Sequence, residues 1–474
     1  MKNQNNTLVF DIGKTNIKAI LFNAKGKIIN EKNQNHKFTS KSNHLNIIQV
    51  DKIYELVIKF IKKISNDFII DKIIFTSHAS TSVININESK NIILPVLDYE
   101  NKFDKKFEDK YFKYHKCAFS ETLTPKLSTG LVLSKTIYYY IDKMKKNFSS
   151  VESIIFYPQY FAWRLSGIKS SEITYVGCHS DLWSFKKENF STFVFKNKLQ
   201  KKIPKLYKSW GKLGKIKKDL SLGTKINPNC NIYCGLHDSN AAYYLYEKKF
   251  NKPFTLVSTG TWVVIFNRQM NLGLLNEKKE IFAKLNVFGK MIPVIRFMGG
   301  REYSVIVKKC LNFTKTKASI DNLFKKKVYA MPSFAEGGPF NNMKGQIINQ
   351  KLIRSQDDYI SLASLYVALI TDYCLKQVDS INSIIIDGGF VKNKVFLYCL
   401  SVLRQNQRIF VNYESNGTAT GAFLLCNKRS NYKLNLEKLP ICSDDVIIKY
   451  KEEWLKLISK KFSNIVLNKN KYEL

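Results

Sequence analysis

Two stretches of this chain share one pattern, in which an apolar strand stops at a short polar turn and then resumes. The first, LVFDIGKTNIKAILFN, spans Leu8–Asn23, and the second, FTLVSTGTWVVIFN, spans Phe254–Asn267. The β-branched and aromatic residues on both sides of each turn predict paired strands. The repeated pattern therefore predicts two related α/β domains. We place their boundary near residues 248–251, which gives domains 1–248 and 249–474.

Composition supports a folded two-domain protein. A chain of 474 residues is longer than a domain with a single hydrophobic core usually is, and 45% of its residues are hydrophobic. No stretch approaches the roughly 20 apolar residues that span a bilayer, and the polar start leaves no room for a signal peptide. We therefore expect a cytoplasmic protein without a membrane partner. The nine cysteines are an odd count without zinc-site spacing, and we expect thiols.

The formal net charge of +38 makes nucleic acid a partner to consider. Lysine is spread along most of the chain, however, and no aromatic residues recur at a spacing suited to base stacking. The densest basic stretch, KLYKSWGKLGKIKKDL at Lys205–Leu220, is either a binding patch or, as we favour, a solvated surface. We expect no specific nucleic acid, and the sequence leaves open whether the charge has a partner.

Several other stretches indicate secondary structure. Lys72–Ser77 and Lys90–Glu100 have the apolar character of strands, and Ile53–Ile64 has the periodicity of an amphipathic helix. Ser153–Gly167 is typical of an apolar helix that a glycine ends. Strands and helices alternate throughout, as in mixed α/β proteins.

The first polar turn contains GKT but is not a P-loop. A P-loop requires glycine where this chain has Leu8, and it requires a helix where this chain continues as a strand. We expect a hairpin whose glycine permits unusual backbone angles and the close approach of a ligand. Main-chain amides and side chains would there form a nest for phosphate oxygens, built from Gly13, Lys14, Thr15, Asn16 and Lys18.

Asp11, at the end of the first strand, would lie beside those phosphates. A carboxylate in that position is useful if Mg²⁺ and its waters lie between the two, which makes Asp11 the candidate metal ligand. The alternative is an ordinary hairpin with a solvated aspartate.

Two later stretches are further nucleotide candidates. The turn of the second hairpin offers hydroxyl groups and a glycine at Ser258, Thr259, Gly260 and Thr261. In SIIIDGGFVKNKVFLYCLSVL, Ser383–Leu403, an apolar strand ends in two glycines before a helix begins near Asn393. Such a turn lets the backbone approach ribose or phosphate. The candidate residues are Gly388, Gly389, Phe390 and Asn393. Plain turns remain the alternative for both stretches.

Taken in order, the three stretches resemble the phosphate-1, phosphate-2 and adenosine motifs of the sugar-kinase, heat-shock-chaperone and actin ATPase superfamily. Within it the chain is similar to the FGGY carbohydrate kinases, and the resemblance runs from Asp11 to about Gly421. It implies two ribonuclease-H-like, actin-like ATPase domains with a catalytic cleft between them. It also implies ATP and Mg²⁺ as cofactors. ESNGTATGAFLL, Glu414–Leu425, resembles the small-residue helix beneath the nucleotide, with Gly417 and Gly421 permitting close packing.

CGLHDSNAAYY, Cys234–Tyr244, contains the candidate catalytic base. The FGGY family has a general base in a Gly-x-x-Asp setting followed by small residues, and Asp238 matches it. An aspartate before SNAA is also a good helix cap, and the two roles can coexist. His237, its neighbour, is a candidate sugar contact.

The family also places sugar-binding groups in the first domain. TSHASTSV, Thr76–Val83, matches a loop near the sugar, with His78 as the candidate. LPVLDYEN, Leu94–Asn101, aligns with a segment that usually has the pattern Trp-x-Asp-x-Arg. Asp98 is retained, but this chain has Val96 and Glu100 at the Trp and Arg positions, which puts the identity of the sugar in doubt. The remaining substrate candidates are Tyr99, Glu100 and Arg301.

The sequence therefore predicts an ATP-dependent carbohydrate kinase that phosphorylates a small ketose of the xylulose, ribulose, L-rhamnulose or L-fuculose type. Its partners would be that sugar and ATP, and the oligomeric state stays open, with a homodimer among the alternatives. One alternative function is a non-sugar ATPase of the actin and chaperone superfamily. The weaker one is a basic nucleic-acid-binding protein.

Overall fold

The computed structural model describes residues 4–42, 44–79, 84–127, 129–222, 225–307, 317–414 and 416–470. They form two compact units. Unit 1 contains Met1–Asn251, Phe282–Ile292 and Asn416–Leu434, and unit 2 contains Lys252–Ile281, Pro293–Ser415 and Asn435–Leu474. The predicted boundary is a single cut between 248 and 251, whereas the chain returns twice to unit 1 after that point.

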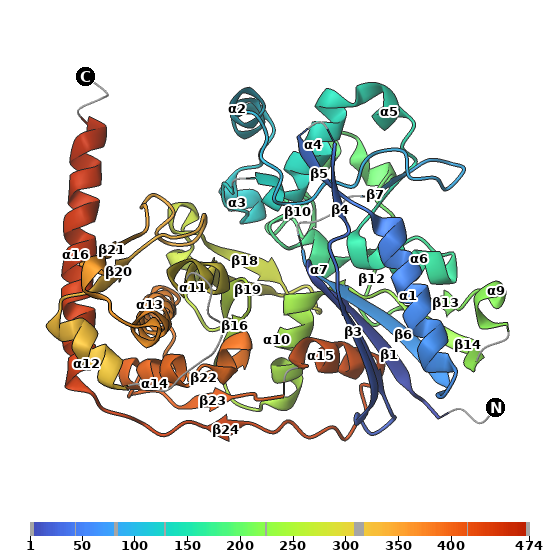
Figure 1. The fold of residues 1–474 in the computed structure, drawn as a ribbon. Helices are drawn as coiled ribbons and strands as arrows, with labels where there is room; N and C mark the ends of the chain where they lie inside the picture. Colours follow the sequence, from blue (N-terminus) through green and yellow to red (C-terminus); the bar gives the residue numbers. More distant parts are fainter. Residues whose placement is uncertain are drawn as a thin grey trace. The chain divides into compact units, whose positions relative to one another are not determined.

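Unit 1 is built on a twisted mixed sheet (Figure 1). Its first strand, β1, pairs antiparallel with β2 through the predicted hairpin and parallel with β6 on its other side. β3 adds antiparallel to β2, and β14 adds parallel to β6. These five of the seven strands in the sheet are β1 (Thr7–Ile12), β2 (Asn16–Phe22), β3 (Ile28–Asn35), β6 (Ile70–Ser77) and β14 (Ile226–Tyr233).

Unit 2 repeats this arrangement. Its strands run in the order β23-β22-β16-β17-β19, with the same parallel and antiparallel pairings as β14-β6-β1-β2-β3. This repetition confirms the predicted pair of related α/β domains. The strands are β16 (Phe254–Thr259), β17 (Val263–Asn267), β19 (Met291–Phe297), β22 (Ser383–Gly388) and β23 (Ile409–Val411). The main helices of unit 2 are α11 (Gly299–Val307), α13 (Gln356–Gln377), α14 (Lys394–Leu403) and α16 (Asp445–Asn470).

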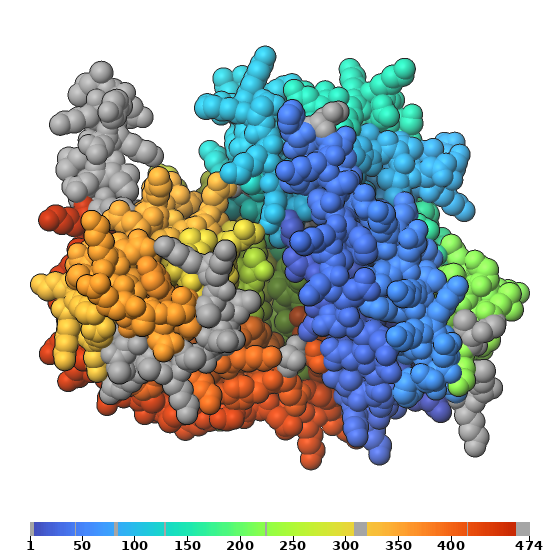
Figure 2. All heavy atoms as spheres, in the orientation of Figure 1, coloured from blue at the N-terminus to red at the C-terminus, as the bar shows by residue number. Residues whose placement is uncertain are grey.

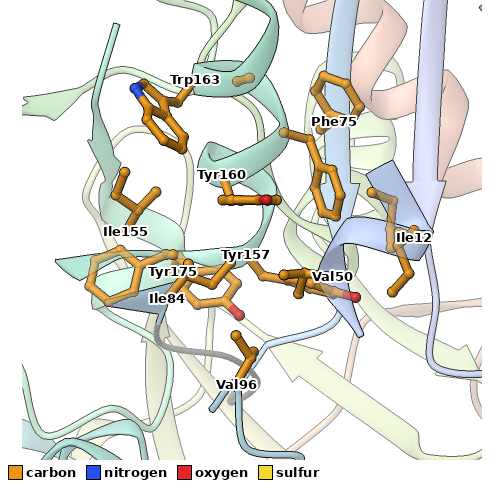
Figure 3. Packing of buried hydrophobic residues seen from close by; sticks show 14 of the residues in the cluster. Ile12, Val50, Phe75, Ile84, Val96, Ile155, Tyr157, Tyr160, Trp163 and Tyr175 are labelled. Atoms are coloured by element: carbon orange, nitrogen blue, oxygen red, sulfur yellow. The ribbon is translucent and has the colours of Figure 1, made fainter. Parts of the chain in front are cut away.

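Helices cover both faces of the unit 1 sheet because its central strands β1, β2 and β6 are largely buried on both sides. On one face Phe10 stacks on Phe75, and Phe75 stacks on Phe161 of α6. Figure 3 shows Phe75 in this core with Tyr157 and Tyr160 of α6 and Val50 of α1. On the other face Phe22 stacks on Phe423 of α15, with ring centroids 4.9 Å apart. The helices are α1 (Val50–Ser65), α6 (Tyr157–Ser166), α10 (Asp238–Lys249) and α15 (Gly417–Cys426).

α10 and α15 approach each other closely within unit 1. A β-carbon on Gly421 would lie 1.9 Å from the carbonyl oxygen of Ala241. The close packing predicted for Gly421 is therefore confirmed. The N-terminal part of the chain, coloured blue, forms a continuous surface of the same unit in the space-filling view (Figure 2).

Two of the local predictions need correction. Lys90–Glu100 contains no strand, only the isolated bridges Ile86↔Ile92 and Ile47↔Leu97, since Pro95 interrupts the run. Ser153–Gly167 is split into a short strand, β8 (Ser153–Ile155), and α6, which ends at Gly167 as predicted. The predictions for Lys72–Ser77 and Ile53–Ile64 are confirmed by β6 and α1.

Within the described ranges, no helix combines the length and apolar character that crossing a membrane requires.

The glycine pair after β22 allows a stability test. Gly388 has a φ of +94°, and a β-carbon there would lie 1.9 Å from the carbonyl oxygen of Thr259, whereas at Gly389 the nearest atom lies 3.9 Å away. We expect Gly388→Ala to lower the free energy of unfolding by about 2 kcal/mol or more, through strain and overpacking. Gly389→Ala is the matched control and should change it by less than about 0.5 kcal/mol in urea unfolding. Equal effects of the two variants would contradict this assignment.

Candidate functional site

The β1–β2 hairpin supplies one carboxylate of the site. Asp11 lies opposite Lys18 in the antiparallel register and beside Thr76 of β6, whose hydroxyl donates a hydrogen bond to Asp11 Oδ1 at 3.1 Å. In the turn, the amide of Gly13 donates to the carbonyl of Asn16 at 2.9 Å. Side chains at the turn are half-buried or exposed, so the loop is open to a ligand.

The reason for glycine at position 13 differs from the prediction. Gly13 does not have a positive φ, so its backbone is not in the left-handed region. A β-carbon there would instead lie 2.9 Å from the carbonyl oxygen of Asn16. The tight turn, rather than unusual backbone angles, therefore requires this glycine.

Asp11 and Asp238 share one electrostatic environment. Burial and then the negative charge of Asp238 raise the pKa of Asp11 to about 6, against the hydrogen bond from Thr76 and the charge of Lys18. The sheet register places them at the same end of unit 1, because His237, which precedes Asp238, pairs with Ser77 of β6, and the adjacent Thr76 pairs with Asp11. The hairpin and the start of α10 therefore contribute to the same site in unit 1.

The contacts of His237 favour a proton on each ring nitrogen. Its Nδ1 lies 2.7 Å from Asn240 Oδ1, and its Nε2 lies 3.1 Å from Asp238 Oδ1. The Asn240 amide is oriented because its Nδ2 donates to the carbonyl of Leu285 at 2.6 Å. Both of these oxygens are acceptors, and Ser239 Oγ, which lies 3.1 Å from each ring nitrogen, already accepts from Lys284, so the contacts favour an imidazolium.

The charges around His237 explain its protonation. Burial opposes the imidazolium, but the negative charges of Cys178 and Asp238 outweigh burial and raise the pKa of His237 to about 9. For Asp238 the balance is reversed. Burial raises its pKa, but the charge and hydrogen bond of His237 outweigh burial and hold the pKa below its usual range. Asp238 is therefore an ionised carboxylate at neutral pH, able to accept a proton.

Sequence reasoning missed three residues around this pair, namely Cys178, Lys284 and Asn240. Burial raises the pKa of Cys178, but the positive charges of His179, Lys284 and His237 outweigh burial and place it well below its usual value. Lys284 Nζ also donates to Ser239 Oγ at 3.3 Å. Lys284 belongs to one of the late segments that join unit 1, and no local motif marks it or Cys178. Asn240 stands within the stretch that contains the candidate base, and its spacing from His237 was the available signal.

Lys14 joins two sets of residues that were predicted separately. Its Nζ lies 2.7 Å from Asp98 Oδ1 and 2.9 Å from Glu100 Oε2, and it lies over the Tyr99 ring, 4.3 Å from the centroid. The side chain of Asp98 is only 4% exposed, whereas that of Glu100 is 42% exposed. Lys14, which the sequence predicted as a phosphate ligand, therefore contacts three of the candidate sugar-binding residues.

His78 lies against the same group. Its ring is 5.6 Å from the Tyr99 ring and 5.4 Å from the Tyr157 ring. Burial lowers the pKa of His78 to about 4, against the opposing charges of Asp238 and Asp98, so the imidazole is neutral at pH 7. Both carboxylates are therefore near enough to His78 to influence its pKa. Residues 80–83 of the predicted loop lie outside the described residues.

Unit 2 places the second hairpin beside the glycine pair. Ser258 is half-buried, and Gly260 and Thr261 are exposed, so the turn is open. Thr259 is buried and connects the two elements. Its hydroxyl donates to the carbonyl of Asp387 at 2.7 Å and accepts from the amide of Phe390 at 3.0 Å.

Three other predicted residues lie in unit 2. Asn393 is fully buried, caps α14 through the amide of Phe396 and donates to Ser364 Oγ at 2.9 Å. Its side chain therefore serves the fold, and this geometry gives no support to a direct ATP contact. Phe390 is buried against Tyr303, with ring centroids 5.5 Å apart. Arg301 is exposed on α11.

The residues around Asp11 fit the predicted magnesium ion. Asp11 and Asp238 concentrate negative charge, and Oδ1 of Asn16 is buried without a hydrogen-bond partner in the part of the chain that the structure describes. A metal-bound water is a donor that such an oxygen lacks. The described residues contain no cluster of three or more His, Cys, Asp or Glu side chains that could by itself hold a metal ion. Mg²⁺ commonly binds through one or two carboxylates, waters and phosphates, which this donor set allows.

Family models match both parts of the chain. The model of the N-terminal domain of the FGGY family of carbohydrate kinases matches residues 6–244, and the model of the carbohydrate kinase FGGY C-terminal domain matches residues 251–433. The chain therefore belongs to the FGGY family of carbohydrate kinases, ATP-dependent enzymes that transfer a phosphoryl group to a sugar. A comparison with curated protein sequences finds no match.

Solved structures share the fold over nearly the whole chain. A carbohydrate kinase from Novosphingobium aromaticivorans is 22% identical, with a TM-score of 0.81 and coverage of 96% of this chain and 98% of that chain. A ligand-bound xylulose kinase from Lactobacillus acidophilus is 13% identical, with a TM-score of 0.81 and coverage of 98% and 100%. A gluconate kinase from the same organism is 13% identical, with a TM-score of 0.81 and coverage of 98% and 99%. These similarities confirm the two-domain α/β fold.

The raised pKa of Asp11 gives a prediction about stability. A folded-state pKa of about 6 against an ordinary 3.8 means that ionising Asp11 costs stability as the pH rises through 6. We expect Asp11→Asn to stabilise the metal-free protein by about 1–3 kcal/mol at pH 8 and to have little effect at pH 4. Urea unfolding at the two pH values measures this, and Asp67→Asn, at an exposed position, is the control.

Magnesium gives the same variant a second readout. Mg²⁺ should raise the unfolding midpoint of the wild-type protein and leave that of Asp11→Asn unchanged. A variant that is equally stabilised by Mg²⁺, or whose effect on unfolding does not depend on pH, would contradict the assignment of Asp11.

Proposed function

We propose that this protein phosphorylates a small ketose of the xylulose, ribulose, L-rhamnulose or L-fuculose type, with Asp238 as the general base. The observation that carries the proposal is the grouping within unit 1 of an ionised Asp238, the carboxylate of Asp11 and the candidate sugar contacts His78 and Asp98. A non-sugar ATPase needs a positioned water, and it has no use for polar groups that bind sugar hydroxyls near a carboxylate base. The similar structures include a xylulose kinase and a gluconate kinase, so the ketose itself belongs to the proposal.

The chemistry follows from the ionisation states of the residues. Asp238 accepts the proton of the sugar hydroxyl as that oxygen attacks the γ-phosphorus, and the bond from phosphorus to the leaving oxygen of ADP breaks. Since phosphoryl transfer proceeds through a loose transition state, a base with a low pKa suffices, because the proton leaves late. His237 keeps Asp238 ionised and oriented through the 3.1 Å contact.

The β1–β2 hairpin would hold the phosphates. Its open turn at Gly13–Asn16 presents amides and the hydroxyl of Thr15, and Lys18 contributes a positive charge beside Asp11. Mg²⁺, when bound near Asp11, neutralises charge on the phosphate oxygens. In unit 2 we propose the exposed turn at Gly260 and Thr261 as a second phosphate contact and Gly388 and Gly389 as the approach for adenosine.

Sugar recognition would depend on the group held by Lys14. Asp98 and Glu100 accept from Lys14, and as carboxylates they keep further lone pairs for sugar hydroxyls. Neutral His78 can donate or accept one more hydrogen bond. We therefore propose Lys14 as a residue that positions the sugar contacts, in place of the predicted phosphate ligand. We also propose that His237 acts on Asp238, because its ring nitrogens are already bound within the protein.

The first test is an ATP-consumption screen over ketoses, aldoses and polyols, followed by Asp238→Asn with the best sugar. Removing the base should lower kcat by about 100-fold or more, while binding of ATP stays within about twofold. Calorimetry with a non-hydrolysable ATP analogue verifies that the variant still binds the nucleotide. ATP turnover that no sugar stimulates would favour the non-sugar ATPase, and near-normal kcat of the variant would reject Asp238 as the base.

Lys14→Met separates the two roles of that lysine. If Lys14 positions Asp98 and Glu100, the KM for the sugar should rise by about tenfold or more, with the KM for ATP nearly unchanged. If Lys14 is a phosphate ligand, the KM for ATP rises instead. Steady-state kinetics with each substrate varied in turn distinguishes these results. Lys25→Met, at an exposed position after the same hairpin, is the control.

A further inference from the structure

A pocket in unit 1 lies away from the catalytic residues. It has a volume of about 480 Å³ and is lined by Lys72, Trp210, Lys212, Lys428 and Arg429 among other residues. Lys72 stands near the start of β6, whereas Thr76, which contacts Asp11, stands near its end. Four residues of strand correspond to about 13 Å. The pocket therefore lies toward the opposite end of β6 from Asp11.

The pocket gathers positive charge from three separate parts of the chain. Lys72 comes from β6, Lys212 from the basic stretch Lys205–Leu220, and Lys428 and Arg429 from the segment that follows α15. None of the described lining residues carries a carboxylate. The basic stretch, which we expected to be a solvated surface, thus contributes to a concave site.

Two of the four cations, Lys72 and Lys428, are held by contacts within unit 1. Lys72 Nζ donates to Asn427 Oδ1 at 2.6 Å and to the carbonyl of Cys426 at 3.3 Å. Asn427 in turn donates to Thr7 Oγ1 at 2.9 Å, which ties this end of the pocket to the start of β1. Lys428 Nζ lies 3.7 Å from the centroid of the Trp210 ring, which orients it by a cation–π contact.

Like charges crowd one another in this pocket. Burial and then the charges of Lys208 and Lys248 lower the pKa of Lys428. Burial and the charge of Lys212 also lower the pKa of Lys72, against the opposing charges of Cys426 and Asp71. Nearby Asp71 gives limited compensation, because its carboxylate already accepts from the amide of Asn6 at 3.0 Å and from Asn227 Nδ2 at 2.8 Å. A bound anion would relieve this repulsion.

We propose that this pocket binds the phosphoryl group of a small phosphorylated molecule. Lysine and arginine are the usual ligands of phosphate oxygens, and several cations on a concave wall focus the field on one anion. The volume suits a metabolite-sized ligand. A nucleic acid would need a longer track of cations with open aromatic faces, whereas the Trp210 ring is covered by Lys428.

The test is calorimetric titration of the full-length protein with inorganic pyrophosphate, in metal-free buffer of constant ionic strength. The charge-reversal pair Lys212→Glu/Lys428→Glu should weaken the binding by at least tenfold. The pair Lys52→Glu/Lys59→Glu on α1 makes the same change in net charge at exposed positions and should alter the binding by less than twofold. The neutral pair Lys212→Gln/Lys428→Gln should give an intermediate loss, which preserves the test if the reversed pair does not fold.

Three results would overturn the proposal. The first is the absence of saturable binding of pyrophosphate to the wild-type protein. The second is an equal loss of pyrophosphate affinity in the pocket pair and the control pair. The third is displacement of pyrophosphate by a single-stranded oligonucleotide whose own binding needs Lys212 and Lys428. A parallel titration with glycerol 3-phosphate shows whether the pocket binds a phosphate ester more tightly than inorganic pyrophosphate. Loss of binding of either probe in the pocket pair alone supports the site.

Discussion

The candidate site of unit 1 depends on the burial of Asp11 near a second carboxylate, Asp238. Burial and the repulsion between the two carboxylates raise the pKa of Asp11 to about 6, a cost that the fold does not remove. Opposing charges are supplied on both sides, by Lys18 next to Asp11 and by the His237 imidazolium next to Asp238. The buried negative charge lowers the stability of the ligand-free protein, and a bound cation and substrate would offset this cost.

Much of the fold could be predicted from the sequence because strand and turn patterns are local. The two hairpins at Leu8–Asn23 and Phe254–Asn267 gave the two related sheets, since the same strand order recurs around each. The strand prediction for Lys90–Glu100 was wrong because apolar character there serves a buried irregular segment, as Val96 and Leu97 show. Apolarity reports burial, and it does not by itself report extended pairing.

The candidate site was predicted in parts, but its connections were not. Asp11, Asp238, His78 and Asp98 stand in recognisable motifs, and the structure brings their charges together in unit 1. The contact of Lys14 with Asp98 joins residues far apart in the sequence, and no spacing rule predicts it. Lys284 and Cys178 carry no motif at all, since their importance comes only from the charges that tertiary packing places beside them.

Unit 1 is discontinuous, and this has a consequence for its biogenesis. α15, at Gly417–Cys426, packs against α10 and the central strands, and Asn427 donates a hydrogen bond to Thr7 in the first strand. A ribosome therefore releases the beginning and the end of this unit far apart in time, with nearly all of unit 2 emerging in between. The nascent N-terminal sheet therefore lacks the cover of α15 on one apolar face until residues 417–426 have been synthesised, and an apolar face exposed in this way is prone to aggregation.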